Sequence, residues 1–467
     1  MYRKEIEQFI DEHLNEMIED ICMLCRINSE KMPYIEGKPY GDGVFDALQA
    51  ALGLMEKYGF SIQNYDNYVG TADLNDKERQ LDILAHLDVV PAGEGWTVTD
   101  AYEPVVKDGK LYGRGTADDK GPAVAALYAM RAIKELNIPV KKNVRLILGT
   151  DEECGSSDIA VYYKREPEAP MTFSPDAEFP VINIEKGRIE GHFKAAFEPS
   201  KALPRLVSLD AGTKSNVVPG KAAAILQGFE PAFLSEAAKK TEEETGVSFD
   251  FVLEEEGVRV TAQGEGAHAS TPQEGKNALT ALLLFLTKLP LADSPQLDAI
   301  KALAELFPHG DTCGKAVGVA MEDEFSGALT LAFDMLKVEN DRLEGVFDSR
   351  TPICANEENS LQVLKREMAA KGITLLNETM IHPHHVDGDS HFVKTLLKVY
   401  EEYTGLKGSC QSTGGGTYVH NLKNGVAFGA SMPGTDNKMH GADEFAVVGE
   451  LALSAKIFAQ VIADLCC

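Results

Sequence analysis

Four short polar segments, each following an apolar run or a glycine turn, constrain the fold of this chain more than any other feature. The segments are HLD at 86–88, GRGTADDKG at 113–121, GTDEECGS at 149–156 and SPDAE at 174–178. Ligand sites of open α/β sheets form in the crevice at the carboxyl ends of the strands. Polar residues that repeatedly follow apolar strands therefore predict a site at one edge of such a sheet.

The residue types in these segments are typical of a metal centre with an acid-base group. His86 and Asp88 are two residues apart, so both side chains share one face of a strand and Asp88 can support a metal-bound imidazole. Of the neighbours Glu152 and Glu153, one carboxylate can ligate a divalent ion while the other acts as a general base toward water. Taken singly, each has an ordinary explanation: a core histidine, solvated glutamates, or a helix N-cap at Asp119. Their combination indicates the metal centre.

Charge and composition exclude several classes of protein. The chain has 467 residues, of which 44% are hydrophobic and 25% charged, as is typical of a globular protein with more than one domain. The formal net charge is -28, from 45 basic and 73 acidic residues, so nucleic acid and anionic membranes are not expected partners. The N-terminal segment does not resemble a secretory signal, and no window approaches a membrane span, so we expect a cytoplasmic protein.

The pattern of the eight cysteines favours packing over metal binding. Cys22 and Cys25 form a C-x-x-C pair, but the chain lacks the second pair that a zinc ribbon needs. The two residues instead continue the apolar face of a helix predicted for 3–25. Free cysteines are typical of a reducing, cytoplasmic compartment.

Periodicity predicts that residues 1–187 form the first part of a domain with an α/β fold. Apolar runs indicate strands at 81–87 and 144–150, and helical spacing indicates helices at 3–25, 43–58 and 120–136. Apolar strands that alternate with helices predict a mostly parallel sheet flanked by helices. The Gly- and Pro-rich segment 91–113, which contains the tryptophan Trp96, is predicted to be a long loop over the site.

After Gly187 the pattern changes to longer alternating strands with isolated helices. Residues 188–384 are therefore predicted to form an inserted α+β lid domain, and 385–467 to complete the first domain. The elements expected here are a hairpin at 249–264, an apolar helix at 277–289, strands at 328–350, and helices at 392–405 and 443–463. His382, His384 and His385 are interpreted as part of a surface crossing between the domains rather than as a metal-binding tract.

The order of the motifs H-x-D, G-R-G-T-A-D-D-K-G, D-E-E, S-P-D-A and M-H-G resembles that of the two-metal aminoacylase, carboxypeptidase and dipeptidase family of metallopeptidases. Within this family, GRGTADDKG, SPDAEFPVINIEKG and GGGTYVHNL are most similar to the PepV-type bacterial dipeptidases, which are carnosinase-like (Xaa-His) enzymes. The resemblance extends over nearly the whole chain. It implies two divalent metal ions as cofactors, with zinc as the expected ion and manganese or cobalt as alternatives.

The resemblance implies a role for each residue of the metal centre. His86 and Asp176 would hold one ion, Glu153 and His440 would hold the other, and Asp118 would bridge the two. Two metal ions about 3.5–4 Å apart can position a water and a substrate carbonyl together.

Three more residues are implied as catalytic groups. Glu152 would be the general base that activates the water and later protonates the leaving amine. Asp88 would support His86, and His268 in GEGAHASTP would stabilise the tetrahedral oxyanion.

The substrate-binding residues implied by the resemblance are Asn216 in KSNVVPG, Arg350 in FDSRTP, and the backbone of Gly415 and Gly416. The guanidinium fork of an arginine suits a bidentate contact with a substrate carboxylate. The chain departs from the family pattern at His420, where an arginine is usual. We expect a weaker or pH-sensitive contact with the substrate at that position.

Together these inferences predict a metal-dependent dipeptidase that hydrolyses small peptides with a free amino terminus. We expect a monomer, because the long insertion supplies the second lid half that dimeric relatives take from a partner. The alternative within enzymes is an N-acyl amino-acid amidohydrolase on the same scaffold. A metal-binding scaffold without catalysis is a third reading, which the retained general base and ligand residues disfavour.

Overall fold

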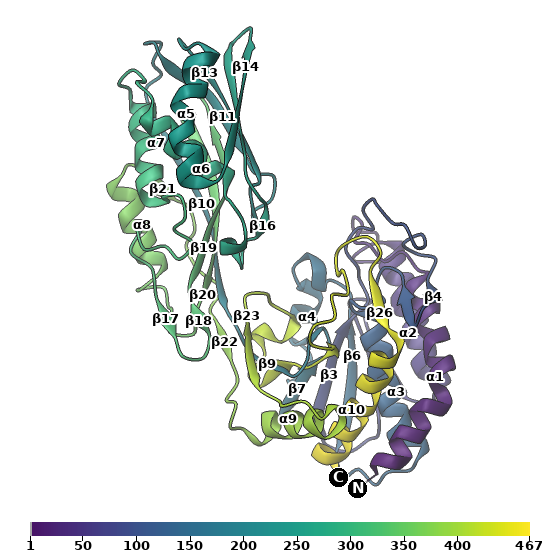
Figure 1. Cartoon of the computed structure of the whole chain (residues 1–467). Helices are drawn as coiled ribbons and strands as arrows, with labels where there is room; N and C mark the ends of the chain where they lie inside the picture. The colour runs from purple at the N-terminus through teal and green to yellow at the C-terminus, as the bar shows by residue number, and fades with distance from the viewer. Residues whose placement is uncertain (1) are drawn as a thin grey trace. The chain divides into compact units, whose positions relative to one another are not determined.

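The computed structural model describes residues 2–467, and residue contacts divide the chain into two units (Figure 1). The first unit comprises the chain through Ile184 with His385–Gln411 and Gly416–Cys467, and the second comprises Glu185–His384 and Ser412–Gly415. The sequence predicts that residues 385–467 all belong to the first domain. Ser412–Gly415 instead group with the second unit, where the backbone N–H of Lys186 donates a hydrogen bond to the Thr413 carbonyl (2.9 Å) and the side-chain Nη1 of Arg350 donates one to the Gly414 carbonyl.

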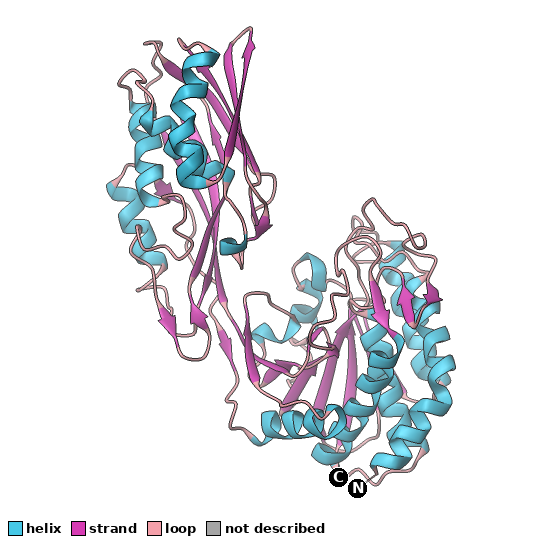
Figure 2. Ribbon diagram, in the orientation of Figure 1, coloured by secondary structure: helices cyan, strands magenta, loops and turns pink. Residues whose placement is uncertain are grey.

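The sheet of the first unit is parallel at its centre (Figure 2). Its strand order is β1 (Ser61–Tyr65), β2 (Val69–Asp73), β6 (Asn143–Gly149), β3 (Arg79–His86), β7 (Met171–Ser174), β24 (Gly425–Ala427), β9 (Val181–Glu185) and β22 (His384–His385), with β23 (Cys410–Thr413) paired to β9. β3 pairs in parallel with β6 and β7, whereas the pairs β1–β2 and β2–β6 are antiparallel. The predicted α/β fold is confirmed, and the carboxyl end of β3 lies at the centre of the sheet.

Side chains of β3 alternate between the two faces of the sheet, and each face packs into a different apolar cluster. Leu81, Ile83 and Ala85 belong to the large core, whereas Leu84 joins a smaller cluster that includes Ile147. The helices that contribute to the large core are α1 (Arg3–Cys25), α2 (Asp42–Lys57), α3 (Lys120–Glu135), α9 (His391–Thr404) and α10 (Val448–Cys466), whereas α4 (Ser157–Tyr162) contributes to the smaller cluster. Cys22 and Cys25 of α1 are buried in the large core, which confirms their predicted packing role.

Two predicted elements of the first unit differ from the structure. The segment 91–113, predicted to be a loop, contains β4 (Val105–Lys107) and β5 (Lys110–Tyr112), which form a small sheet with β26 (Phe445–Val447). The last helix was predicted to begin at 443 but begins at Val448, because residues 445–447 pair with β5 as a strand. The strand β26 leaves no local sequence signal because its partner β5 is distant in the chain, whereas β4 and β5 form a local hairpin whose turn is Asp108–Gly109.

The second unit consists of an antiparallel sheet with helices on one of its faces (Figure 2). The strand order is β14 (Ser248–Glu254), β15 (Gly257–Gln263), β13 (Lys221–Gln227), β11 (Arg205–Ala211), β19 (Thr330–Val338), β20 (Arg342–Thr351), β10 (Gly187–Ala196) and β21 (Thr374–Leu375). The helices α5 (Pro231–Thr245), α6 (Ala278–Lys288), α7 (Pro295–Leu306) and α8 (Leu361–Ala370) share one apolar core with this sheet. The predicted α+β character is confirmed. Within the described residues, no helix combines the length and the apolar character that a bilayer crossing needs.

Asp82 on β3 gives the first unit a pH-dependent stability. The residue is fully buried, and Arg79 Nε lies 3.6 Å from Oδ1. Burial raises the pKa of Asp82 from 3.8 to about 7. The folded state therefore binds a proton on Asp82 more tightly than the unfolded chain does. Below the ordinary pKa the carboxyl is protonated in both states and its ionisation costs no stability, whereas above the raised pKa the buried carboxylate destabilises the fold by the full amount.

Replacing Asp82 by asparagine should therefore stabilise the first unit increasingly as the pH rises. Relative to the wild type, we expect the free energy of unfolding to increase by up to about 3–4 kcal/mol between pH 4 and pH 8. Chemical denaturation of both proteins at several pH values measures this difference. A difference that is constant with pH would contradict a raised pKa for Asp82.

Candidate functional site

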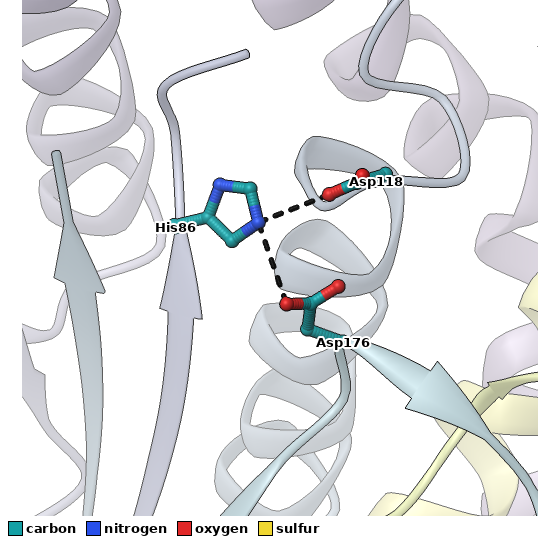
Figure 3. Close-up of side chains that lie close together, drawn as sticks. All are labelled: His86, Asp118 and Asp176. Atoms are coloured by element: carbon teal, nitrogen blue, oxygen red, sulfur yellow. Dashed lines mark ion pairs between the residues drawn. The ribbon is translucent and has the colours of Figure 1, made fainter. Parts of the chain in front are cut away.

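His86, Asp118 and Asp176 converge at the carboxyl edge of the first unit's sheet (Figure 3). His86 is the last residue of β3, Asp118 precedes α3, and Asp176 follows β7. His86 Nε2 lies 3.0 Å from Asp118 Oδ1 and 3.6 Å from Asp176 Oδ2. One atom from each residue lies within 4.8 Å of the others, which is a spacing that one metal ion can bridge.

Asp118 also belongs to a second cluster, with Glu153 and His440. Its other oxygen, Oδ2, lies 2.9 Å from His440 Nε2, and Glu153 Oε1 lies 3.3 Å from the same nitrogen. The ligand atoms of this cluster also lie within 4.8 Å of one another. Each oxygen of Asp118 therefore faces a different cluster, which is the arrangement that a bridging carboxylate between two ions requires.

The donor atoms of the two clusters fit two divalent cations. His86 Nε2 and Glu153 Oε1 are buried without a hydrogen-bond partner in the part of the chain that the structure describes. Buried polar atoms are normally satisfied, so the two atoms are explained if they are metal ligands. Two imidazoles with three carboxylates suit zinc, manganese or cobalt.

The charges of the site show why cations would stabilise it. The neighbouring carboxylates of Asp118 and Glu153 raise the pKa of His440 to about 10. Burial alone would lower the pKa of His86, but its carboxylate neighbours Asp118 and Asp176 raise it well above its ordinary value. In the absence of metal, the protons on the imidazoles thus balance the carboxylates. Metal binding has to displace these protons and takes over their electrostatic role.

Glu152 is next to Glu153 in the chain but is absent from both clusters of candidate ligands. Burial raises the pKa of Glu152 well above its ordinary value, and the negative charge of Asp176 adds to the shift. The side chain therefore holds or accepts a proton more readily than an exposed glutamate. Glu153 belongs to a ligand cluster and Glu152 does not, which is the arrangement expected of a metal ligand beside a general base.

Asp88 supports the site through two different groups. The main-chain oxygen of Asp88 lies 3.0 Å from His86 Nδ1, which favours the proton on Nδ1 and leaves Nε2 free to ligate. The carboxylate is 3.5 Å from the same nitrogen, and it accepts hydrogen bonds from the backbone N–H groups of Glu152 and Glu153 (both 3.1 Å). The sequence indicates only the role of Asp88 toward His86, because the direction of the Asp88 carboxylate depends on the backbone of a distant turn.

Glu444 is a residue of the site that the sequence analysis missed. Its Oε1 accepts hydrogen bonds from the backbone N–H groups of Gly115 (3.0 Å), Ala117 (3.0 Å) and Asp118 (3.3 Å), and its Oε2 pairs with Arg114 Nη1 at 2.5 Å. Arg114 and Glu444 are both buried. Together they connect the segment that carries Asp118 to the segment that follows His440. An arginine inside a glycine turn, which needs a carboxylate partner when buried, is the signal that could have revealed this pair.

The predicted residues His268, Asn216, Arg350 and Gly415 belong to the second unit. Arg350 on β20 directs Nε and Nη2 to the carboxylate of Asp348 (2.6 and 3.0 Å) and Nη1 to the Gly414 carbonyl. One edge of its guanidinium is therefore occupied, and a substrate carboxylate would use the N–H groups that remain on Nη1 and Nη2. The functional interpretation of the motif considered the arginine without Asp348 and therefore missed this restriction.

Backbone pairing between two short segments of the second unit brings His268 and Asn216 close together. His268 on β16 (Ala267–His268) pairs with Val217, and its Nδ1 lies 2.6 Å from Ser270 Oγ. The carbonyl of Asn216 accepts the N–H of Ala269 (2.9 Å). The N–H of Gly415 donates to Thr413 Oγ1 (3.0 Å), whereas Gly416 and His420 belong to the first unit.

Comparison with known proteins gives a family and several relatives. The family model described as "Peptidase family M20/M25/M40" matches residues 83–464. The putative dipeptidase YtjP of Bacillus subtilis is 36% identical over 456 residues, which are 96% of this chain and 97% of that protein. The Beta-Ala-Xaa dipeptidase of Lactobacillus delbrueckii subsp. lactis is 36% identical over 92% of this chain and 91% of its own length.

Solved structures show the same fold at low sequence identity. Human carnosine dipeptidase 1 aligns with a TM-score of 0.59 and 14% identity, over 100% of this chain and 99% of that chain. The aminoacylhistidine dipeptidase of Vibrio alginolyticus also gives a TM-score of 0.59 and 14% identity, over 95% and 96% of the two chains.

Proposed function

The chain belongs to peptidase family M20/M25/M40, and we propose that it is a metal-dependent dipeptidase acting on dipeptides with a free amino terminus. The observation that carries this proposal is Asp118, whose two oxygens face two separate ligand clusters. The dipeptidase names of relatives that match over most of this chain support the choice of substrate.

The metal ligands in this proposal are the residues of the two clusters. His86 and Asp176 would hold one ion, Glu153 and His440 the other, and Asp118 would contact both. When bound, the two cations would lower the pKa of a water molecule and polarise the scissile carbonyl. Zinc is the proposed ion, with manganese and cobalt as alternatives because the same donor set accepts all three.

The proton transfers in this proposal are carried by Glu152. A carboxylate oxygen of Glu152 would accept the proton of the attacking water and then deliver it to the nitrogen of the leaving amine. Asp88 would hold Glu152 in place through the backbone N–H that its carboxylate accepts. The Glu152 side chain is half-buried, and its raised pKa would favour retention of the proton until the second transfer.

The substrate-binding roles remain proposals that rest on the family resemblance of their motifs. His268 would stabilise the oxyanion, Arg350 would bind a substrate carboxylate, and Asn216, Gly415 and Gly416 would contact the substrate. The bidentate support of Arg350 by Asp348 favours this role, because it fixes the guanidinium in one orientation. We further propose a monomer, since the insertion is long enough to supply both lid halves, and a cytoplasmic location, which the free buried thiols of Cys22 and Cys25 favour.

Hydrolysis assays on metal-stripped and refilled protein test the proposed function. The substrates are matched unblocked and N-acetylated dipeptides, α- and β-alanyl dipeptides, and N-acyl amino acids. We expect turnover of the unblocked dipeptides only after zinc, manganese or cobalt is restored, by a species whose mass in light scattering is that of the 50.7 kDa chain. Turnover confined to N-acyl amino acids would favour the amidohydrolase alternative, and metal binding without any turnover would favour the scaffold.

A further inference from the structure

We propose that Asp158 and Tyr418 are positioning residues that hold the turn carrying Glu152. This inference deepens the proposed function and rests on it, since it assigns the support of the proposed general base. Neither residue is among the predicted site residues, although Tyr418 belongs to the GGGTYVHNL segment that the sequence analysis singled out.

Two carboxylates bind the four consecutive backbone N–H groups of residues 150–153. Asp158 Oδ2 accepts the first two, at 2.5 and 3.2 Å, and the two oxygens of Asp88 accept the last two, both at 3.1 Å. Charge-assisted hydrogen bonds to backbone N–H groups are about twice as strong as neutral ones. Asp158 therefore fixes the backbone of this turn as much as Asp88 does. The backbone in turn sets the position from which the Glu152 side chain extends.

The phenol of Tyr418 holds Asp158 in turn. The Tyr418 hydroxyl donates a hydrogen bond to Asp158 Oδ2 (2.6 Å) and accepts one from the backbone N–H of Asp151 (3.3 Å). The Tyr418 ring packs edge-on to the His86 ring, with 6.2 Å between the ring centroids. Tyr418 and Asp158 are both buried, so neither is in a position to exchange these partners for bulk water.

Gly149 provides an independent observation that the turn is built around this phenol. A Cβ atom placed on Gly149 would lie 2.1 Å from Tyr418 Oη, which is far inside van der Waals contact. Only glycine therefore lets the strand β6 end so close to the hydroxyl. The sequence GTDEE thus combines the residue that admits Tyr418 with the residues whose N–H groups the two carboxylates bind.

The other contacts of the turn hold Asp151 rather than Glu152, since the Asp151 carboxylate accepts hydrogen bonds from Lys31 Nζ (2.6 Å) and from Ser157 Oγ (2.6 Å). Residues 152–154 form a single short 3-10 turn, and its first residue receives no side-chain cap from Asp151. A displacement of about 1 Å at a catalytic group can cost on the order of 100-fold in rate. Loss of the Tyr418 hydroxyl, which leaves Asp158 and its other bonds in place, should produce a smaller displacement and a smaller loss.

The test compares Tyr418→Phe with the matched control Tyr65→Phe. Both tyrosines are buried in the same apolar cluster, but the Tyr65 hydroxyl donates to Glu166 (2.9 Å) rather than to the turn. We expect Tyr418→Phe to lower kcat about tenfold with KM and metal content unchanged. We expect Tyr65→Phe to retain the kcat of the wild type, with a similar change in melting temperature for both variants.

Two further measurements separate positioning from a merely structural role. Asp158→Asn should lower kcat at least as much as Tyr418→Phe, and the double variant should be no worse than Asp158→Asn, because the phenol acts through Asp158. Hydrogen–deuterium exchange of the peptide 149–156 should be up to about tenfold faster in Tyr418→Phe than in Tyr65→Phe. Equal kcat and equal exchange in the two phenylalanine variants would overturn the proposal, as would a loss of kcat that follows a loss of bound metal. The exchange experiment needs no substrate, so it decides the positioning role even if the protein hydrolyses no dipeptide.

Discussion

Replacing Glu152 by glutamine is expected to remove nearly all turnover while both metal ions remain bound. The amide has the size of the carboxylate but cannot accept the proton of the attacking water or return it to the leaving amine. General acid-base catalysis contributes about 10²–10⁴-fold, and because Glu152 would serve both transfers we expect a loss of kcat near ~10³–10⁴-fold. Steady-state assays on the zinc-loaded variant, with the metal content measured on the same sample, test this expectation.

The matched control is the same substitution one residue later. Glu153 belongs to the cluster of Asp118 and His440, so Glu153→Gln should lose one equivalent of metal. Glu152 lies outside both clusters, so its variant should keep both equivalents. If Glu152→Gln lost metal and Glu153→Gln kept it, the assignment of base and ligand would have to be reversed.

The pair of glutamates shows how far residue types and spacing determine a site. The strand period brings His86 to the end of β3, and the apolar run before Gly149 brings the glutamates to the end of β6, which pairs in parallel with β3. Parallel neighbours end at the same edge, so the convergence of these groups follows from the sequence. The sequence does not determine which glutamate faces which neighbour, because the backbone of the turn sets the directions of adjacent side chains. Only the family resemblance distinguished the two roles in advance.

The support of the site escaped the sequence analysis for a related reason. Glu444 accepts hydrogen bonds from the backbone N–H groups of Gly115, Ala117 and Asp118, which lie more than 300 positions away in the chain. Backbone N–H groups are present at every position except proline, so they leave no pattern in the sequence that could indicate their acceptor. The same is true of Asp158, which accepts two N–H groups of the turn before Glu152. A buried carboxylate of this kind resembles any other acidic residue until its surroundings are known.

Arg350 illustrates the opposite case, in which the motif was informative but incomplete. The segment FDSR contains both the arginine and Asp348, the residue that occupies one edge of its guanidinium. Because the two residues are two apart on β20, their side chains lie on the same face of the strand. The sequence therefore contained the pair, and the strand period was sufficient to suggest it.

Replacing Asp118 by asparagine is expected to disrupt the metal centre more than any other single change of a ligand. Asp118 Oδ1 lies 3.0 Å from His86 Nε2, and Oδ2 lies 2.9 Å from His440 Nε2, so the carboxylate serves both clusters. Asparagine keeps one oxygen and replaces the other with an NH₂ group, which cannot ligate a cation. We expect the variant to bind at most one equivalent of zinc tightly and kcat to fall by roughly 10³-fold or more, since a two-metal site needs both ions.

The control for Asp118→Asn is Asp176→Asn, which changes a carboxylate of only one cluster. Asp176 Oδ2 lies 3.6 Å from His86 Nε2, and Asp176 is absent from the cluster of Glu153 and His440. Asp176→Asn should therefore lower the affinity for one metal ion and leave the other ion tightly bound. Asp118→Asn should lower the affinity for both ions, and a calorimetric titration measures these affinities. Two tight equivalents in Asp118→Asn would show that its oxygens are not shared between two ions. The site would then consist of two independent mononuclear centres, and a single bridging carboxylate could no longer explain why both clusters meet at this residue.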